Sequence, residues 1–195
     1  MLSNYSKKSK IILKIFAVIL VVFWLIFVAA TVFTAFEKKY VYPLLYKEEI
    51  TAAANRYGLD AALLFGVVKT ESGFNAGAVS DKGAVGLMQI TPSTGEYLAK
   101  RRGIEKYDLS DAATNLDFGA YYLKYLSESF CGITEIAAAY NAGEGTVRTW
   151  LKNKEYSPDG RTLKTIPYGE TYVYVKKICK SLKRYRKLYG KLLDK

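Results

Sequence analysis

Glu71 is the residue best suited to chemistry in this sequence, because it is a carboxylate where the local pattern expects an apolar side chain. Leu64, Val67 and Val68 recur at the three- and four-residue spacing of one helix face, and Glu71 falls next on that face. Burial disfavours an ionised carboxylate and raises its pKa, which leaves a protonated acid able to donate. The pattern therefore predicts a general acid at Glu71, and a surface glutamate near a helix end is the alternative.

The residue types present exclude several other kinds of catalytic site. The 195 residues include no His, which removes Ser-His-Asp and Cys-His catalysis and the common His-based zinc sites. The two cysteines, Cys131 and Cys179, cannot form a four-ligand metal cluster by themselves, so we expect neither a metal nor another cofactor. In an oxidising exterior they could form a disulfide, and two buried thiols would give the same pattern.

The elements that must position Glu71 are mainly helices, and no convincing strand pattern occurs. After Pro43 a helix of about a dozen residues ends at Gly58, and Asp60 caps the next helix, which carries Glu71 and is expected to end near Gly73. Thr91 and Pro92 begin another helix. Further helical patterns cover residues 111–130, 133–142, 144–153 and 168–189, and loops are expected at 75–86 and 156–167.

An uncharged run near the N-terminus predicts a membrane anchor. Residues 15–36 carry no charge and would form a helix of about 33 Å, which is enough to cross a bilayer. Four lysines and no acid precede this run, so the positive-inside rule places residues 1–14 in the cytoplasm and the rest of the chain outside a cell membrane crossed once. Residues 37–45 would then be a linker. A cleaved signal peptide is the competing interpretation.

The net charge of +11 belongs mostly to the C-terminal end. Residues 37–175 carry 16 basic and 17 acidic side chains, whereas residues 176–195 carry nine basic and one acidic. This end predicts either a helix docked by an apolar stripe or attraction to anionic lipid headgroups or anionic wall polymer. Nucleic acid is not an expected partner, because the basic residues are not spread along a groove with aromatics. The stripe consists of Val175, Ile178, Leu182, Tyr185 and Leu188.

Three separated segments, in this order, resemble the signature segments of the soluble lytic transglycosylase (SLT) domain family. They are ESGFNAGAVSDKGAVGLMQITPST from Glu71, AAAYNAGEGTVRTW from Ala137 and IPYGETYVYVKKI from Ile166. The resemblance covers residues 46–189 and leaves 190–195 as a basic end. It implies a lysozyme-like helical fold that cleaves peptidoglycan glycan strands, with Glu71 as the single catalytic acid.

The same resemblance implies a set of substrate-binding residues, several of which have simpler interpretations. Ser80 alone would be a turn hydroxyl, Met88 alone would fill the core, and Glu170 alone would be a favourable first-turn charge on a helix. Gly83 and Gly86 would let the backbone approach the glycan. The full implied set is Ser80, Met88, Gln89, Tyr140, Asn141, Glu170 and Tyr174.

A single carboxylate is sufficient if the substrate takes part in the reaction. In substrate-assisted enzymes the 2-acetamido carbonyl of the sugar attacks the anomeric carbon. The resemblance implies cleavage of the β-1,4 bond between N-acetylmuramic acid and N-acetylglucosamine, in which Glu71 protonates the leaving oxygen and then deprotonates the C6 hydroxyl, giving a 1,6-anhydro end. One alternative is a goose-type-lysozyme-like muramidase that uses Asp81 or Asp117 to position water. Others are a non-catalytic glycan-binding wall anchor and a purely structural membrane protein.

Overall fold

The computed structural model describes residues 2–193, and it describes the side chains of residues 12–190, 192 and 193. The chain divides into two units, Met1–Pro43 and Leu44–Lys195, each of which is considered by itself. The first unit consists of α1 (Leu2–Phe36) and a π-helical turn, η1 (Glu37–Val41). Within it, an 18-residue stretch of Ile12–Val41 has a mean hydropathy of 3.0, and this helix is long and apolar enough to cross a membrane. The helix begins before the uncharged run that predicted it.

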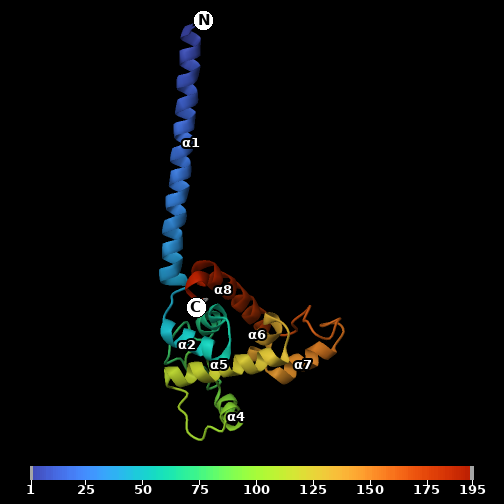
Figure 1. The fold of residues 1–195 in the computed structure, drawn as a ribbon. Coiled ribbons are helices and arrows are strands. Elements are labelled where there is room, and N and C mark those ends of the chain that lie inside the picture. Colours follow the sequence, from blue (N-terminus) through green and yellow to red (C-terminus); the bar gives the residue numbers. More distant parts are fainter. Residues whose placement is uncertain (1, 194–195) are drawn as a thin grey trace. The chain divides into compact units, whose positions relative to one another are not determined.

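The second unit is built from seven helices among the described residues. Figure 1 shows α8 on one side of this unit and α4 on the other, with α5 between them. Only isolated β-bridges, and no strand, occur in the part of the chain that the structure describes, which confirms the expected mainly α class. The helices are α2 (Lys47–Tyr57), α3 (Ala61–Glu71), α4 (Pro92–Arg102), α5 (Ala112–Ser129), α6 (Ile133–Ala142), α7 (Glu144–Lys152) and α8 (Gly169–Leu193).

The expected caps are present where local chemistry requires them. Gly58 ends α2 in the left-handed conformation, with φ of 62°, which glycine adopts without steric cost. Asp60 Oδ1 accepts a hydrogen bond of 2.6 Å from the amide of Ala62 at the start of α3. Thr91 caps α4 in the same way by accepting from the amide of Thr94. These three predictions are confirmed, and α3 ends at Glu71, two residues before Gly73, near which its end was expected.

Helix α3 forms the centre of the core, and α8 packs along it. Every residue from Ala61 to Val68 is buried. The two helices approach each other closely at Gly66, where an added Cβ would lie 3.3 Å from the Cβ of Ser181. An ion pair of 2.6 Å between Arg186 of α8 and the capping residue Asp60 joins the same helices. Helix α3, which carries Glu71 at its C-terminal end, is therefore held against α8.

The C-terminal end forms a helix that is docked by its apolar stripe, which is the first of the two interpretations that the sequence left open. Val175, Ile178, Leu182 and Tyr185 are buried, and Leu188 is half-buried. The helix continues to Leu193, beyond the expected end at residue 189. Its lysines at 176, 177, 180, 183 and 187 are exposed, so the basic surface that the second interpretation needs is also present.

Both cysteines are free thiols in this structure. Cys131 is exposed and precedes α6, whereas Cys179 is half-buried on α8. Burial raises the pKa of the Cys179 thiol, which favours its protonated form at neutral pH. The two thiols are therefore separate, but they are not the two buried thiols of the second interpretation, because Cys131 is exposed.

Candidate active site

Glu71 is the last residue of α3, and its carboxyl group is largely buried. The hydroxyl of Tyr174, on α8, donates a hydrogen bond of 2.6 Å to Glu71 Oε1. Burial raises the pKa of Glu71 from 4.5 to about 7, while the hydrogen bond from Tyr174 acts in the opposite direction. The protonated and ionised forms of Glu71 are therefore both accessible near neutral pH, as a group that first donates and later accepts a proton requires.

Tyr140 lies beside Glu71 and connects it to the loop that follows α3. Burial first, and then the charge of Glu71, raises the pKa of Tyr140 well above its usual value. The Tyr140 hydroxyl donates a hydrogen bond of 2.8 Å to the carbonyl of Met88. Helix α6 thus places Tyr140 between the acid and the segment Gly86–Gln89, and the structure brings these predicted residues together.

The side chains of Ser72 and Gln89 hold the loop that follows α3 by hydrogen bonds to its carbonyl groups. The Ser72 hydroxyl donates to the Leu87 carbonyl at 2.9 Å. The Gln89 side-chain amide donates to the carbonyls of Ala78 and Gly86 at 3.1 and 3.0 Å. Because these donors hold the loop, the sugar contact predicted for Gln89 would have to use its side-chain oxygen.

Asn115 of α5 holds the loop that follows α3, and the sequence did not lead us to expect this role. It is fully buried and forms three hydrogen bonds to backbone groups. Its Oδ1 accepts from the amide of Met88 at 2.8 Å, and its Nδ2 donates to the carbonyls of Val85 and Leu109, each at 2.9 Å. The sequence did contain a signal for this role, because Asn115 lies three positions before Phe118 and therefore on the same, buried face of the helical pattern.

Position 86 requires glycine for a structural reason that its place in the loop did not predict. Its φ is +78°, and an added Cβ would overlap the side-chain amide of Asn115. The close approach that the structure shows is therefore to Asn115, and an approach of the glycan to this backbone stays a prediction. Gly83 has φ of +75° and nothing within 4 Å of an added Cβ, so it serves the turn at 80–83.

Met88 and Ser80 both take part in local structure. The Met88 side chain is fully buried and packs so closely on Gly119 that a Cβ there would overlap it. This burial favours the core-filling role over the predicted sugar contact, because no part of the side chain is open to a ligand. The Ser80 hydroxyl is half-buried and accepts a hydrogen bond of 3.0 Å from the amide of Ala84, as a turn hydroxyl does.

The remaining predicted residues lie where α6 ends and α8 begins. Asn141 is exposed, and its Oδ1 accepts a hydrogen bond of 2.7 Å from the hydroxyl of Thr171. Glu170 is exposed in the first turn of α8, where a negative charge is also favourable to the helix. Tyr174 is buried, so its contact with Glu71 makes it a residue that positions the acid.

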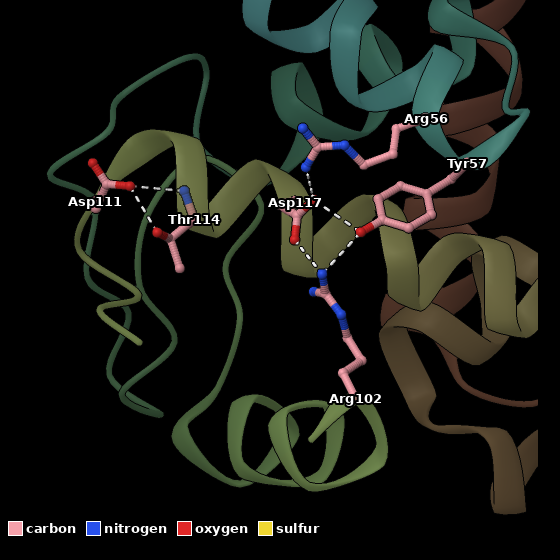
Figure 2. Close-up of polar contacts among 6 residues, drawn as sticks. All are labelled: Arg56, Tyr57, Arg102, Asp111, Thr114 and Asp117. Carbon is pink, nitrogen blue, oxygen red and sulfur yellow. Dashed lines mark hydrogen bonds and ion pairs between the residues drawn. The ribbon is translucent and has the colours of Figure 1, made fainter. Parts of the chain in front are cut away.

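Asp117 is held in a cluster of charged and aromatic side chains (Figure 2). Its two oxygens accept hydrogen bonds of 2.6 Å from Arg56 of α2 and Arg102 of α4, and the hydroxyl of Tyr57 donates to Oδ1 at 2.8 Å. Burial alone would raise the pKa of Asp117, but the contacts with Arg102, Tyr57 and Arg56 outweigh it and lower the pKa. Asp117 therefore joins α2 and α4 to α5 as a permanent anion. Both oxygens already accept hydrogen bonds, so a water positioned by Asp117, as the hydrolase alternative requires, would have to share them.

The comparison with known proteins agrees with this fold. A family model for the transglycosylase SLT domain matches residues 48–161. The soluble lytic murein transglycosylase of Salmonella typhimurium is 35% identical over 156 residues, covering 76% of this chain and 24% of that relative. The membrane-bound lytic murein transglycosylase C of Mannheimia succiniciproducens is 35% identical over 167 residues, covering 73% and 47% of the two chains.

Solved structures show the same relationship. The crystal structure of the 70-kDa soluble lytic transglycosylase of Escherichia coli superposes with a TM-score of 0.71 and 31% identity over 84% of this chain and 27% of that one. An inactive mutant of lytic transglycosylase Slt from Pseudomonas aeruginosa superposes with a TM-score of 0.67 and 32% identity, over 75% and 24% of the two chains. The chain belongs to the transglycosylase SLT domain family. It spans about a quarter of the length of the soluble relatives.

Proposed function

We propose that this protein is a membrane-anchored lytic transglycosylase that cleaves the glycan strands of peptidoglycan between N-acetylmuramic acid and N-acetylglucosamine. The observation that carries the proposal is the largely buried carboxyl group of Glu71, with a pKa of about 7 and a hydrogen bond from Tyr174. Membership of the SLT family supports the substrate class, since the relatives are named as murein transglycosylases. A solved complex of the 70-kDa soluble lytic transglycosylase with bulgecin A is a further structural relative.

The proposed mechanism uses Glu71 twice. Protonated Glu71 gives its proton to the glycosidic oxygen while the 2-acetamido carbonyl of the muramyl residue attacks the anomeric carbon, so the bond to the leaving sugar breaks. The Glu71 carboxylate then removes the proton of the C6 hydroxyl. The C6 oxygen attacks the anomeric carbon and displaces the acetamido oxygen, which leaves a 1,6-anhydro end and restores protonated Glu71. No water is consumed.

Other residues would support these steps without transferring a proton themselves. Tyr174 donates to the carboxylate form of Glu71 and stabilises it between the two steps. Tyr140 and the loop Gly86–Gln89 would form the wall of the site beside the acid, with Ser80, Gln89, Asn141 and Glu170 as the proposed sugar contacts. The interactions of Met88 support a packing role for that residue.

Analysis of the released products tests the reaction directly. The full-length protein in detergent is incubated with purified peptidoglycan, and the products are analysed by mass spectrometry. Products that end in 1,6-anhydro-muramic acid, lighter by one water than the hydrolysed sugar, are the expected result. Reducing ends would establish a goose-type-lysozyme-like muramidase instead, and binding without release would establish a glycan-binding wall anchor.

We further propose that residues 15–36 anchor the enzyme in the cell membrane with its N-terminus inside and its SLT domain outside. The apolar helix Ile12–Val41 and the lysines that precede its uncharged run support this orientation. Protease added to intact protoplasts should remove residues 46–189. Protection of that domain, or its full recovery from the medium, would contradict the topology.

A further inference from the structure

A cavity of about 410 Å³ lies between α8, the start of α6 and the loop that precedes α8. Thr134 of α6 and residues 163–166 of the loop form part of its lining, which does not include Glu71. The lining residues of α8 are Tyr172, Val175, Lys176 and Cys179. Helical periodicity places these four on a different face of α8 from Tyr174, which contacts Glu71, so the cavity is separate from the candidate active site.

The loop wall of this cavity is held in place by hydrogen bonds from its backbone. The amide of Leu163 donates at 2.7 Å to Oε1 of Glu135, a buried carboxylate of α6. The amides of Lys164 and Thr165 both donate to the carbonyl of Tyr156, at 2.8 and 3.2 Å. Because these bonds fix three successive residues of the wall, a ligand that enters loses little free energy to ordering the site.

The cavity has the size and the lining of a small-molecule site. Leu163 and Ile166 are half-buried and Val175 is buried, so the cavity has an apolar interior. Thr134 and Thr165 add two hydroxyl groups. Small-molecule sites are typically concave and mostly apolar, have volumes of about 300–1,000 Å³, and contain a few polar groups that orient the ligand. The volume and the side chains of this cavity meet these criteria.

The charged groups around the cavity favour an anion. Lys164 and Lys176 line it, and no acidic side chain of the described residues does. Burial raises the pKa of the Cys179 thiol, while the charges of Lys183 and Lys176 act in the opposite direction. Glu135 is the acid that also acts on this thiol, and it already accepts a hydrogen bond from the loop. A carboxylate bound beside the two lining lysines would therefore form charge-assisted hydrogen bonds with little competition.

We propose that this cavity binds a small organic anion, whose apolar body lies between α6, α8 and the loop and whose carboxylate contacts Lys164 and Lys176. The Lys176 ammonium lies 5.5 Å from the centroid of the Tyr172 ring, so an aromatic surface and a positive charge border the cavity together. The ligand class is an aromatic or aliphatic carboxylate. The inference goes beyond the proposed function and does not depend on it, because Glu71 is not part of this site.

Alkylation of Cys179 tests the proposal, because this thiol lines the cavity whereas Cys131 is exposed outside it. The full-length protein in a non-ionic detergent is treated with iodoacetamide at increasing concentrations of 4-phenylbutyrate, and mass spectrometry follows each cysteine. The probe should slow alkylation of Cys179 by about tenfold at ten times its Kd, since only the unoccupied protein reacts, and should leave Cys131 unaffected. Calorimetry on the same protein measures the affinity independently of thiol reactivity.

The neutral amide of the probe and three variants test the role of charge. 4-Phenylbutyramide keeps the apolar body and should bind roughly tenfold more weakly, and Lys164→Gln and Lys176→Gln should each weaken 4-phenylbutyrate by about threefold to tenfold. Lys177→Gln is the matched control, since Lys177 is an exposed lysine of α8 that does not line the cavity, and it should leave the affinity unchanged.

Two kinds of result would overturn the inference. Equal affinity for the acid and its amide, or the same loss in Lys177→Gln as in Lys164→Gln and Lys176→Gln, would overturn recognition of an anion. The absence of saturable 4-phenylbutyrate binding in both the alkylation and the calorimetry would overturn the site itself. Either result would leave the proposed function standing, because neither the probe nor the variants involve Glu71.

Discussion

The Tyr174 hydroxyl and the Glu71 carboxylate form a hydrogen bond of 2.6 Å between residues 103 positions apart in the sequence. Burial and this hydrogen bond act on Glu71 in opposite directions, and burial is the larger effect. The result is an acid whose two protonation states are close in free energy near neutral pH. Four predictions concern this pair and the residues that hold the neighbouring loop.

Glu71→Gln should abolish most activity and leave the fold intact. Glutamine keeps the shape of the side chain but cannot transfer a proton, so cleavage of peptidoglycan should fall by about 10² to 10⁴. Release of soluble products from purified peptidoglycan measures the loss, and circular dichroism checks the fold. Near-wild-type release by the variant would remove Glu71 from the mechanism.

The same variant should differ from the wild type in how its stability depends on pH. The folded pKa of about 7 lies above the usual 4.5, so between these values the folded protein binds more protons than the unfolded one. Wild-type stability should therefore fall as pH rises through this window, by on the order of 3 kcal/mol. The stability of Glu71→Gln lacks this decrease. The difference in the free energy of unfolding between the variant and the wild type, measured by urea denaturation, should therefore grow from pH 4.5 to pH 7 and then level off. A constant difference would contradict the raised pKa.

Tyr174→Phe should move the pH dependence of cleavage. The substitution keeps the ring but removes the hydrogen bond that favours ionised Glu71, so the pKa of Glu71 should rise further. Because the first step needs protonated Glu71, the limb at which kcat/KM falls with rising pH should shift to higher pH. A loss of activity at all pH values with no shift would indicate that Tyr174 only supports packing.

Asn115→Ala should destabilise the loop that borders the acid. The change leaves the Met88 amide and the carbonyls of Val85 and Leu109 without their partner, at a cost of about 2–4 kcal/mol in the free energy of unfolding. Chemical denaturation measures this cost, and hydrogen exchange at the Met88 amide should accelerate. Asn55→Ala, at an exposed site of α2, is the control and should be neutral or slightly stabilising.

Asp117→Asn should reduce stability without changing the chemistry of the product. The cluster in Figure 2 loses its charge-assisted bonds to Arg56 and Arg102, which should cost about 1–3 kcal/mol. Glu128→Gln, which breaks an exposed pair with Lys124, should cost less than about 1 kcal/mol. The ratio of anhydro to reducing ends, measured by mass spectrometry, should not change. Selective loss of reducing ends in Asp117→Asn would instead give Asp117 the water-positioning role.

Neutralising the exposed lysines of α8 should weaken attraction to anionic partners while preserving the docked helix. Lys177, Lys183 and Lys187 are exposed, and each should contribute up to about 1 kcal/mol near an anionic surface. Replacing all three by Gln should reduce sedimentation of the protein with purified cell walls at low salt and remove most of its salt dependence. The melting temperature should change little, because the buried stripe is untouched.

A matched set on another surface separates this effect from net charge. Lys100, Lys106 and Lys152 are also exposed and lie outside α8. Their replacement by Gln removes the same charge and should leave wall binding nearly unchanged. Equal losses in the two sets would show that the location of the basic residues has no importance.

The sequence alone determined the features that depend on short-range chemistry. Gly58, Asp60 and Thr91 mark helix ends because a left-handed backbone and a side-chain acceptor are local requirements. The stripe that ends at Glu71 predicted burial of an acid because helical periodicity places these residues on one face. The family resemblance, carried by three ordered segments, predicted the helical fold, and its implied residues include Tyr174, whose hydroxyl contacts Glu71.

Tertiary structure decided which groups serve the acid and which serve the fold. The contact of Tyr174 with Glu71 depends on how α8 lies against α3, which no local pattern specifies. Met88 is buried because Gly119 makes room for it, and Asn115 holds the loop because α5 passes beneath it. The roles of these side chains follow from which helices pack together, since hydrogen bonding and desolvation act over a few ångströms whatever the separation along the chain.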